Sequence, residues 1–149
     1  GALVMEWNCV KNRDDIKELF DIYDAFHDSC IVSLAYKSGN FVDSSNAMCF
    51  GNSKDCVVCV TFQRQGEPRT IELCFLGVRR MNIVGVRENY SSEILGVSLD
   101  FYTDMFSDYT GQVVAWSNNE DFNVDSITEC ENITYIIADS LKWRIVETN

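Results

Sequence analysis

The sequence is short of proline, histidine and positive charge. Its 149 residues include 1 Pro and 1 His, and 23 acidic side chains outnumber 12 Lys and Arg, giving a net charge of −11. An anionic surface repels phosphate backbones, so the charge argues against nucleic acid as a ligand. A chain of this length, without a Pro-rich or Gly/Ser-rich linker, predicts a single domain over residues 1–149.

Long apolar runs and a leader-like start are also missing. No run approaches the roughly 20 apolar residues that a membrane-spanning helix needs. Glu6 interrupts the apolar start of the chain, and no basic residue precedes it, which is unlike a secretory signal. The 7 cysteines are odd in number and spread through the chain, as is typical of reduced thiols. These features predict a cytoplasmic protein that does not contact a membrane.

The sequence has none of the common signatures of nucleotide binding, serine hydrolysis or zinc proteolysis. Cys56 and Cys59 have CxxC spacing, but they lie in a predicted strand, and zinc would need two further ligands. Residues 121–125 copy the first ligand positions of a calcium loop, whereas Ser126 and Asn132 replace its glycine and its bidentate glutamate. We therefore expect no cofactor and no metal.

One amphipathic helix is expected near the start of the chain. Apolar side chains recur there at the i, i+3, i+4, i+7 spacing of a single helical face: Ile16, Leu19, Phe20 and Tyr23. Asn12 and Asp14 are alternative N-caps, and the helix should end near Asp24.

From Ser29 onward the apolar residues alternate with period 2, as in β-strands. A hairpin is expected between residues 56–62 and 71–75, and a symmetric turn about Gly66 and Glu67 would place Cys59 opposite Cys74. Further strands are expected at residues 31–36, 48–50, 78–84, 95–102, 112–116, 133–137 and 141–145. The pattern predicts a mainly β (α+β) protein, an antiparallel sandwich or open barrel of about eight strands with one N-terminal helix.

His27 is the only histidine and is followed by Asp28. A histidine steered by a carboxylate can act as a general base, so these two residues are the candidates if the protein is a small enzyme. Neighbouring strand residues point to opposite faces, however, and no third partner can be named from the sequence. The alternative is that His27 or Asp28 ties the helix-to-strand junction by hydrogen bonds. No catalytic residue is assigned.

Residues 88–141 contain eleven acidic side chains and no Lys or Arg. Such a region can simply keep the protein soluble, or it can attract a basic protein partner by charge complementarity. If a partner binds there, we expect it to contact Glu120, Asp121, Asp125 and Glu129.

The segment Phe26–His27–Asp28–Ser29–Cys30–Ile31 resembles a group of small bacterial proteins of unknown function. In these proteins a His-Asp-Ser or His-Asp-Ala sequence opens the first strand of an antiparallel sheet. Residues 36–39, 62–65, 71–73 and 141–144 fit the same pattern. Some proteins of this type are similar to immunity proteins, which neutralise secreted bacterial toxins by binding them. The resemblance implies a small, acidic, cytosolic and non-catalytic binding protein.

The leading interpretation is therefore a binding protein with a basic protein partner, and its oligomeric state is left open. One alternative is a small enzyme that uses His27 and Asp28. Another is a receptor for a small ligand, with a barrel-like pocket of roughly 300 Å³ or more lined by aromatic residues. Trp7, Trp116 and Trp143 are candidate walls for such a pocket, although tryptophans at strand spacing are more often part of the core.

Overall fold

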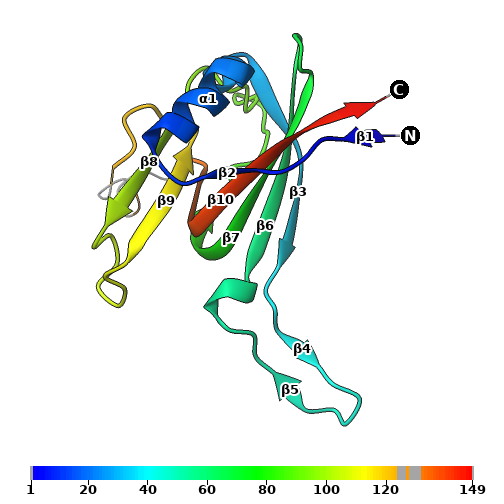
Figure 1. The fold of residues 1–149 in the computed structure, drawn as a ribbon, viewed down its shortest axis with the longest axis vertical. Helices are drawn as coiled ribbons and strands as arrows, with labels where there is room; N and C mark the ends of the chain where they lie inside the picture. Colours follow the sequence, from blue (N-terminus) through cyan, green and yellow to red (C-terminus); the bar gives the residue numbers. More distant parts are fainter. Residues whose placement is uncertain (1, 124–126, 128–131, 149) are drawn as a thin grey trace.

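The computed structural model describes residues 2–123, 127 and 132–148. Within these residues the protein is mainly β, with one α-helix and an antiparallel main sheet that is not closed into a barrel (Figure 1). The predicted fold class is thereby confirmed. No helix in the described part of the chain has the length and apolar character needed to cross a membrane.

The helix α1 (Arg13–Tyr23) forms where the spacing predicted it. Asn12 is the N-cap: its side chain accepts a hydrogen bond from the Asp15 N–H over 3.0 Å. Asp24 closes the helix in the left-handed conformation, at φ 50°. The apolar stripe, with Leu19 and Tyr23 fully buried, packs against the sheet. A short 3₁₀ turn, η1 (Asp24–Phe26), then leads into the sheet.

The main sheet has the order β3–β6–β7–β10–β9–β8, and its neighbouring strands are antiparallel. The bounds of these strands are β3 (Ser29–Lys37), β6 (Val57–Arg64), β7 (Thr70–Asn82), β10 (Tyr135–Thr148), β9 (Gln112–Ser117) and β8 (Ser98–Thr103). Two short strands, β1 (Ala2–Val4) and β2 (Asn8–Val10), pair with the second half of β10. The two termini consequently lie close together (Figure 1).

The β6–β7 hairpin has the predicted register, with Cys59 opposite Cys74. Val58, Val60 and Phe62 form its buried face, as their alternation indicated.

The strands β7 and β10 are longer than predicted, because each joins two segments that the alternation had separated. The register shift between Ile137 and Ala138 of β10 marks a bulge in β7, where Arg79 is the extra residue, and Gly77, two residues earlier in β7, has φ +69°. A bulge resets the alternation of side chains between the two faces. The apolar period therefore breaks there although the strand continues.

The sheet carries a separate apolar cluster on each face. The larger one lies between α1 and the central strands and includes Phe26, Phe62 and Trp116, whose rings pack edge to face or tilted. The smaller one covers the other face of β9 and β10, where Val113 and Tyr135 pack against Phe122. Adjacent residues of β9 thus enter different clusters, as expected for a strand buried on both faces.

A hairpin arm projects from the sheet (Figure 1). It contains β4 (Phe41–Val42) and β5 (Met48–Cys49), which pair with each other only, and a 3₁₀ turn, η2 (Ser53–Asp55), leads back to β6. The strand at residues 48–50 was predicted, whereas β4 was not. Phe41 and Phe50 are among the exposed apolar side chains of the arm.

Candidate functional site

The candidate site forms around the loop between β7 and β8. This loop leads to β8 at one edge of the sheet, and on the way it contacts the start of β3 at the other edge. The Asp28 N–H donates to the Ile94 carbonyl, and the Ile94 N–H donates to the Ser29 carbonyl, each over 2.9 Å. His27 Nδ1 lies 2.6 Å from the carbonyl oxygen of Leu95. The start of β3 is thereby connected to the segment before β8. Residues of this loop line two hollows.

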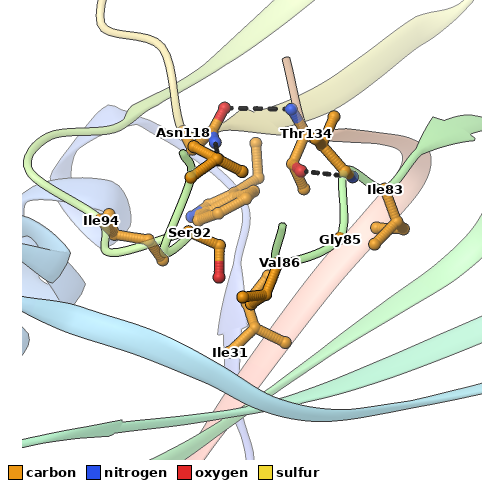
Figure 2. Close-up of a pocket in the computed structure, with 11 residues that line it drawn as sticks. Ile31, Ile83, Gly85, Val86, Ser92, Ile94, Asn118 and Thr134 are labelled. Atoms are coloured by element: carbon orange, nitrogen blue, oxygen red, sulfur yellow. Dashed lines mark hydrogen bonds between the residues drawn. The ribbon is translucent and has the colours of Figure 1, made fainter. Parts of the chain in front are cut away.

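The first hollow, called the apolar cavity, has a volume of about 180 Å³ and is lined by Ile31, Val86, Ile94, Trp116 and Thr134, among others. Figure 2 shows Ile31 and Val86 on one side of the cavity and the polar residues Asn118 and Thr134 on the opposite side. Among the residues that the structure describes, none that lines the cavity is charged. It is smaller than the roughly 300 Å³ expected of a receptor pocket, and aliphatic side chains outnumber aromatic ones in its wall.

Asn118 and Thr134 form the polar side of the apolar cavity. The Thr134 N–H donates to Asn118 Oδ1 over 3.0 Å, and the Val84 N–H donates to Thr134 Oγ1 over 3.0 Å (Figure 2). Asn118 Nδ2 in turn donates to the phenol oxygen of Tyr90 over 3.2 Å. These bonds hold the ends of the loops on both sides of the cavity.

The second hollow, called the acidic recess, has a volume of about 480 Å³ and shares Tyr90 and Asn118 with the apolar cavity. Its walls carry the carboxylates of Glu93, Glu120 and Asp121. Glu120 lies directly over Gly96, because a Cβ atom built on that glycine would overlap the carboxylate.

The carboxylates of the acidic recess form no salt bridge within the described part of the chain. Glu93, Glu120 and Asp121 are absent from the salt bridges formed by the described residues. The guanidinium of Arg87 instead donates to Asn132 Oδ1, at the edge of the recess, over 2.7 Å. The recess therefore concentrates negative charge in a concave surface, where a cation is attracted most strongly.

His27 is solvent-exposed and is held by two acceptors. The Leu95 carbonyl contacts Nδ1, and the Asp28 carboxylate lies 3.4 Å from Nε2. Both favour the imidazolium form, so the carbonyl first and the carboxylate second raise the pKa of His27 above its ordinary value.

The hydroxyl beside His27 is not available as a nucleophile. Ser29 is buried, and its Oγ donates to the Phe26 carbonyl over 2.6 Å. His27 and Asp28 thus form a structural link between β3 and the loop before β8, and the geometry of a nucleophile with its base is missing among these residues. This link therefore includes the loop before β8 as well as the helix-to-strand junction that the sequence suggested.

The CxxC cysteines do not form a site of their own. Cys59 faces Cys74 across the hairpin, with 2.9 Å between the sulfur atoms, and both are free thiols. Cys56 comes just before β6 and is half-buried. In the described part of the chain no three His, Cys, Asp or Glu side chains are grouped in a way that could hold a metal ion.

The structure brings two of the four predicted partner-binding residues together, Glu120 and Asp121. Asp125 and Glu129 lie outside the described residues. Sequence reasoning missed Glu93 and the apolar cavity, because both depend on the long loops converging in space. The absence of Lys and Arg over residues 88–141 was the one signal that pointed to this side of the molecule.

No protein-family model matches the chain, and it has no significant match among curated proteins or solved structures. The resemblance to immunity-type proteins therefore stays a prediction.

Proposed function

We propose that this protein is a non-catalytic binding protein whose acidic recess receives a lysine or arginine side chain of a basic protein partner. An immunity-type role in the bacterial cytoplasm, in which the partner is a toxin, is the most specific form of this proposal. The observation that carries it is the concave grouping of Glu93, Glu120 and Asp121 without a salt bridge among the described residues.

The chemistry of the acidic recess suits a cationic side chain. Ionised carboxylates are acceptors only, and they bind ammonium and guanidinium groups with short, charge-assisted hydrogen bonds. Asn119 and Asn132 line the same recess and add amide groups that can orient such a donor.

The charge of the whole chain supports the same proposal. With −11 overall and no Lys or Arg over residues 88–141, the field around the recess attracts positive surfaces and repels phosphate backbones. Complementary charge of this kind mainly accelerates association and selects against wrong partners.

The experiment uses a dye-labelled hexalysine peptide and fluorescence anisotropy at low salt. The test variant carries Glu93→Gln, Glu120→Gln and Asp121→Asn, which remove three charges with little change in size. We expect it to bind at least about tenfold more weakly than the unmodified protein, because charged contacts inside a recess are screened less than those on an open surface.

A matched control carries Glu6→Gln, Glu18→Gln and Glu147→Gln, which remove the same charge from exposed positions outside the recess. The proposal requires this control to bind within about twofold of the unmodified protein, since distant exposed charges are largely screened. Equal weakening of both variants would show that only net charge matters and would refute a recess site. Absence of binding to the unmodified protein would refute it as well.

A further inference from the structure

The thiols of Cys59 and Cys74 take no part in the proposed function, and neither residue lines the apolar cavity or the acidic recess. Their sulfur atoms are 2.9 Å apart across the β6–β7 hairpin, and both thiols are free. Val58 and Val60 belong to the larger apolar cluster, so the alternation of strand residues places Cys59 on the opposite face of the sheet. The pair is therefore a separate chemical site.

The backbone pairing at this position has the geometry of a cross-strand disulfide. The Arg64 N–H donates to the Arg69 carbonyl over 3.0 Å, and hydrogen-bonded and non-hydrogen-bonded pairs alternate along an antiparallel ladder. Counted from Arg64 and Arg69 along the unbroken register, Cys59 and Cys74 form a non-hydrogen-bonded pair. The Cα atoms of such a pair are about 4.5 Å apart, within the range of roughly 4.4–6.8 Å that a disulfide spans. The two sulfur atoms can therefore join with little movement of the strands.

The two thiols differ in their access to solvent. Cys59 is half-buried, and its other neighbour in register is the small, exposed residue Ala35 of β3. Cys74 is buried, and burial, followed by the hydrogen bond with Cys59, raises the pKa of Cys74 to about 12. A small uncharged oxidant therefore reaches Cys59 first, and Cys74 is the partner that completes the reaction.

A positive charge lies beside the pair. Lys142 of β10 is opposite Cys74 in register, on the side away from Cys59. Its ammonium group favours the thiolate of Cys74 and so opposes the effect of burial on the pKa of that thiol. Negative charge that develops on this sulfur as it loses its proton is therefore stabilised.

We propose that Cys59 and Cys74 form a reversible redox pair that hydrogen peroxide converts into a disulfide. The Cys59 sulfur attacks one oxygen of the peroxide and the O–O bond breaks, which gives the sulfenic acid of Cys59 and a hydroxide that takes up the Cys59 proton as water. The Cys74 sulfur then attacks the sulfur of the sulfenic acid. The S–O bond breaks, and the hydroxyl group leaves as water with the Cys74 proton. The two thiols are oxidised, and the peroxide is reduced to water.

The disulfide is a transient state in a reducing compartment, where other thiols reduce it again. While it lasts, it links β6 to β7 in the middle of the sheet and fixes the register of their hairpin.

The test starts from the reduced whole protein, which has seven thiols, and adds an equimolar amount of hydrogen peroxide. Trypsin cuts after Lys and Arg, so Cys59 and Cys74 fall in separate peptides, residues 55–64 and 70–79. We expect two fewer free thiols, a mass decrease of two hydrogen atoms, and a linked pair of these peptides in mass spectrometry. Dithiothreitol should separate the peptides and restore every thiol.

The peptide of residues 55–64 also contains Cys56, which supplies the matched control. Cys56→Ser should give the linked peptides in the same yield, whereas Cys59→Ser should give none. In Cys74→Ser the sulfenic acid of Cys59 has no partner thiol, so dimedone should trap it on residues 55–64. In the unmodified protein dimedone should capture at least about tenfold less, because the adjacent thiol reacts first.

The reaction depends on the fold, which brings the two thiols together. In denaturant the linked peptides should therefore form at least about tenfold more slowly. An equal rate in denaturant would overturn the proposal. So would oxidation confined to the exposed thiols of Cys9 and Cys30, or a link that Cys56→Ser abolishes. If Cys59→Ser or Cys74→Ser does not fold, the mapped link in the unmodified protein and in Cys56→Ser still decides the matter.

Discussion

The imidazole of His27 lies between the carbonyl oxygen of Leu95 and the carboxylate of Asp28. Because both oxygens favour the imidazolium form, the pKa of His27 is raised above its usual value of 6.5. The chain has a single histidine, so one imidazole signal reports this titration. We expect its NMR midpoint to lie above 6.5 and to fall in Asp28→Asn; a midpoint at or below 6.5 would contradict the contact with Leu95.

The same contact predicts a pH dependence of stability. A group whose pKa is higher in the folded state stabilises the fold fully below its unfolded pKa, and this contribution disappears as the pH rises through the folded pKa. His27→Gln should therefore lower Tm more at acidic than at alkaline pH. The opposite trend in thermal unfolding would show that the folded state favours the neutral imidazole of His27 and would contradict the raised pKa.

The facing thiols of Cys59 and Cys74 predict a specific pattern of reactivity. Burial, and then the hydrogen bond with Cys59, raise the pKa of Cys74 to about 12, so this thiol is protonated at neutral pH. Protein purified without reductant should show seven free thiols after denaturation, with Cys74 unreactive in the native state. Recovery of only five thiols would reveal a disulfide and would contradict the predicted cytoplasmic location.

Among the elements, β7 and β10 are irregular near Gly77, and the backbone there favours glycine. Its φ of +69° is rarely adopted by other residues, and a Cβ atom there would lie 2.5 Å from Asp139 Oδ2. Arg79 holds that carboxylate with a 2.6 Å bond, so Asp139 cannot move away freely. Gly77→Ala should lower the free energy of unfolding by about 1–3 kcal/mol, as expected for a strained backbone position.

Urea unfolding measures this effect, and Gly85→Ala is the matched control. A Cβ atom at Gly85 meets no neighbour within 4 Å, so the free energy of unfolding should change by less than about 0.5 kcal/mol. Equal effects of the two substitutions would mean that glycine is not required at position 77.

The β4–β5 arm should be dispensable for folding, because none of its apolar side chains belongs to either cluster on the sheet. Its base is narrow: a Cβ atom on Gly51 would lie 2.8 Å from the Gly39 carbonyl oxygen. Replacing residues 40–50 by Asn-Gly should therefore shift Tm by less than about 4 °C, which corresponds to roughly 1 kcal/mol in a domain of this size. Loss of cooperative unfolding would show that the arm supports the sheet.

Local patterns sufficed to predict α1 and the β6–β7 hairpin, because a cap, an apolar stripe and a short turn are read from neighbouring residues. The same patterns missed the continuity of β7 and β10, since the bulge at Arg79, opposite Ile137 and Ala138, interrupts the alternation without a turn. Glu120 and Asp121 were recognised from charge alone. Trp116, a candidate pocket wall from the sequence, lines the apolar cavity. Glu93 lies next to the bridge between Ile94 and Ser29, a contact with no local signal.

In the whole molecule, the loop between β7 and β8 connects the two edges of the open sheet. The apolar cavity and the acidic recess both lie beside this loop. The carboxylates of the acidic recess form no salt bridge in the described part of the chain. We infer from this arrangement that the recess, rather than the net charge of −11, recognises a basic group.

Chemical-shift mapping with hexalysine distinguishes a recess site from general attraction to net charge. If the recess is the binding site, the backbone amide signals of Gly96, Asn119, Glu120 and Asp121 should move most, and they should saturate together. Added salt should reverse the shifts, because the contact is electrostatic. Shifts spread evenly over acidic positions of α1 and the arm, or none at the recess, would contradict binding in the recess.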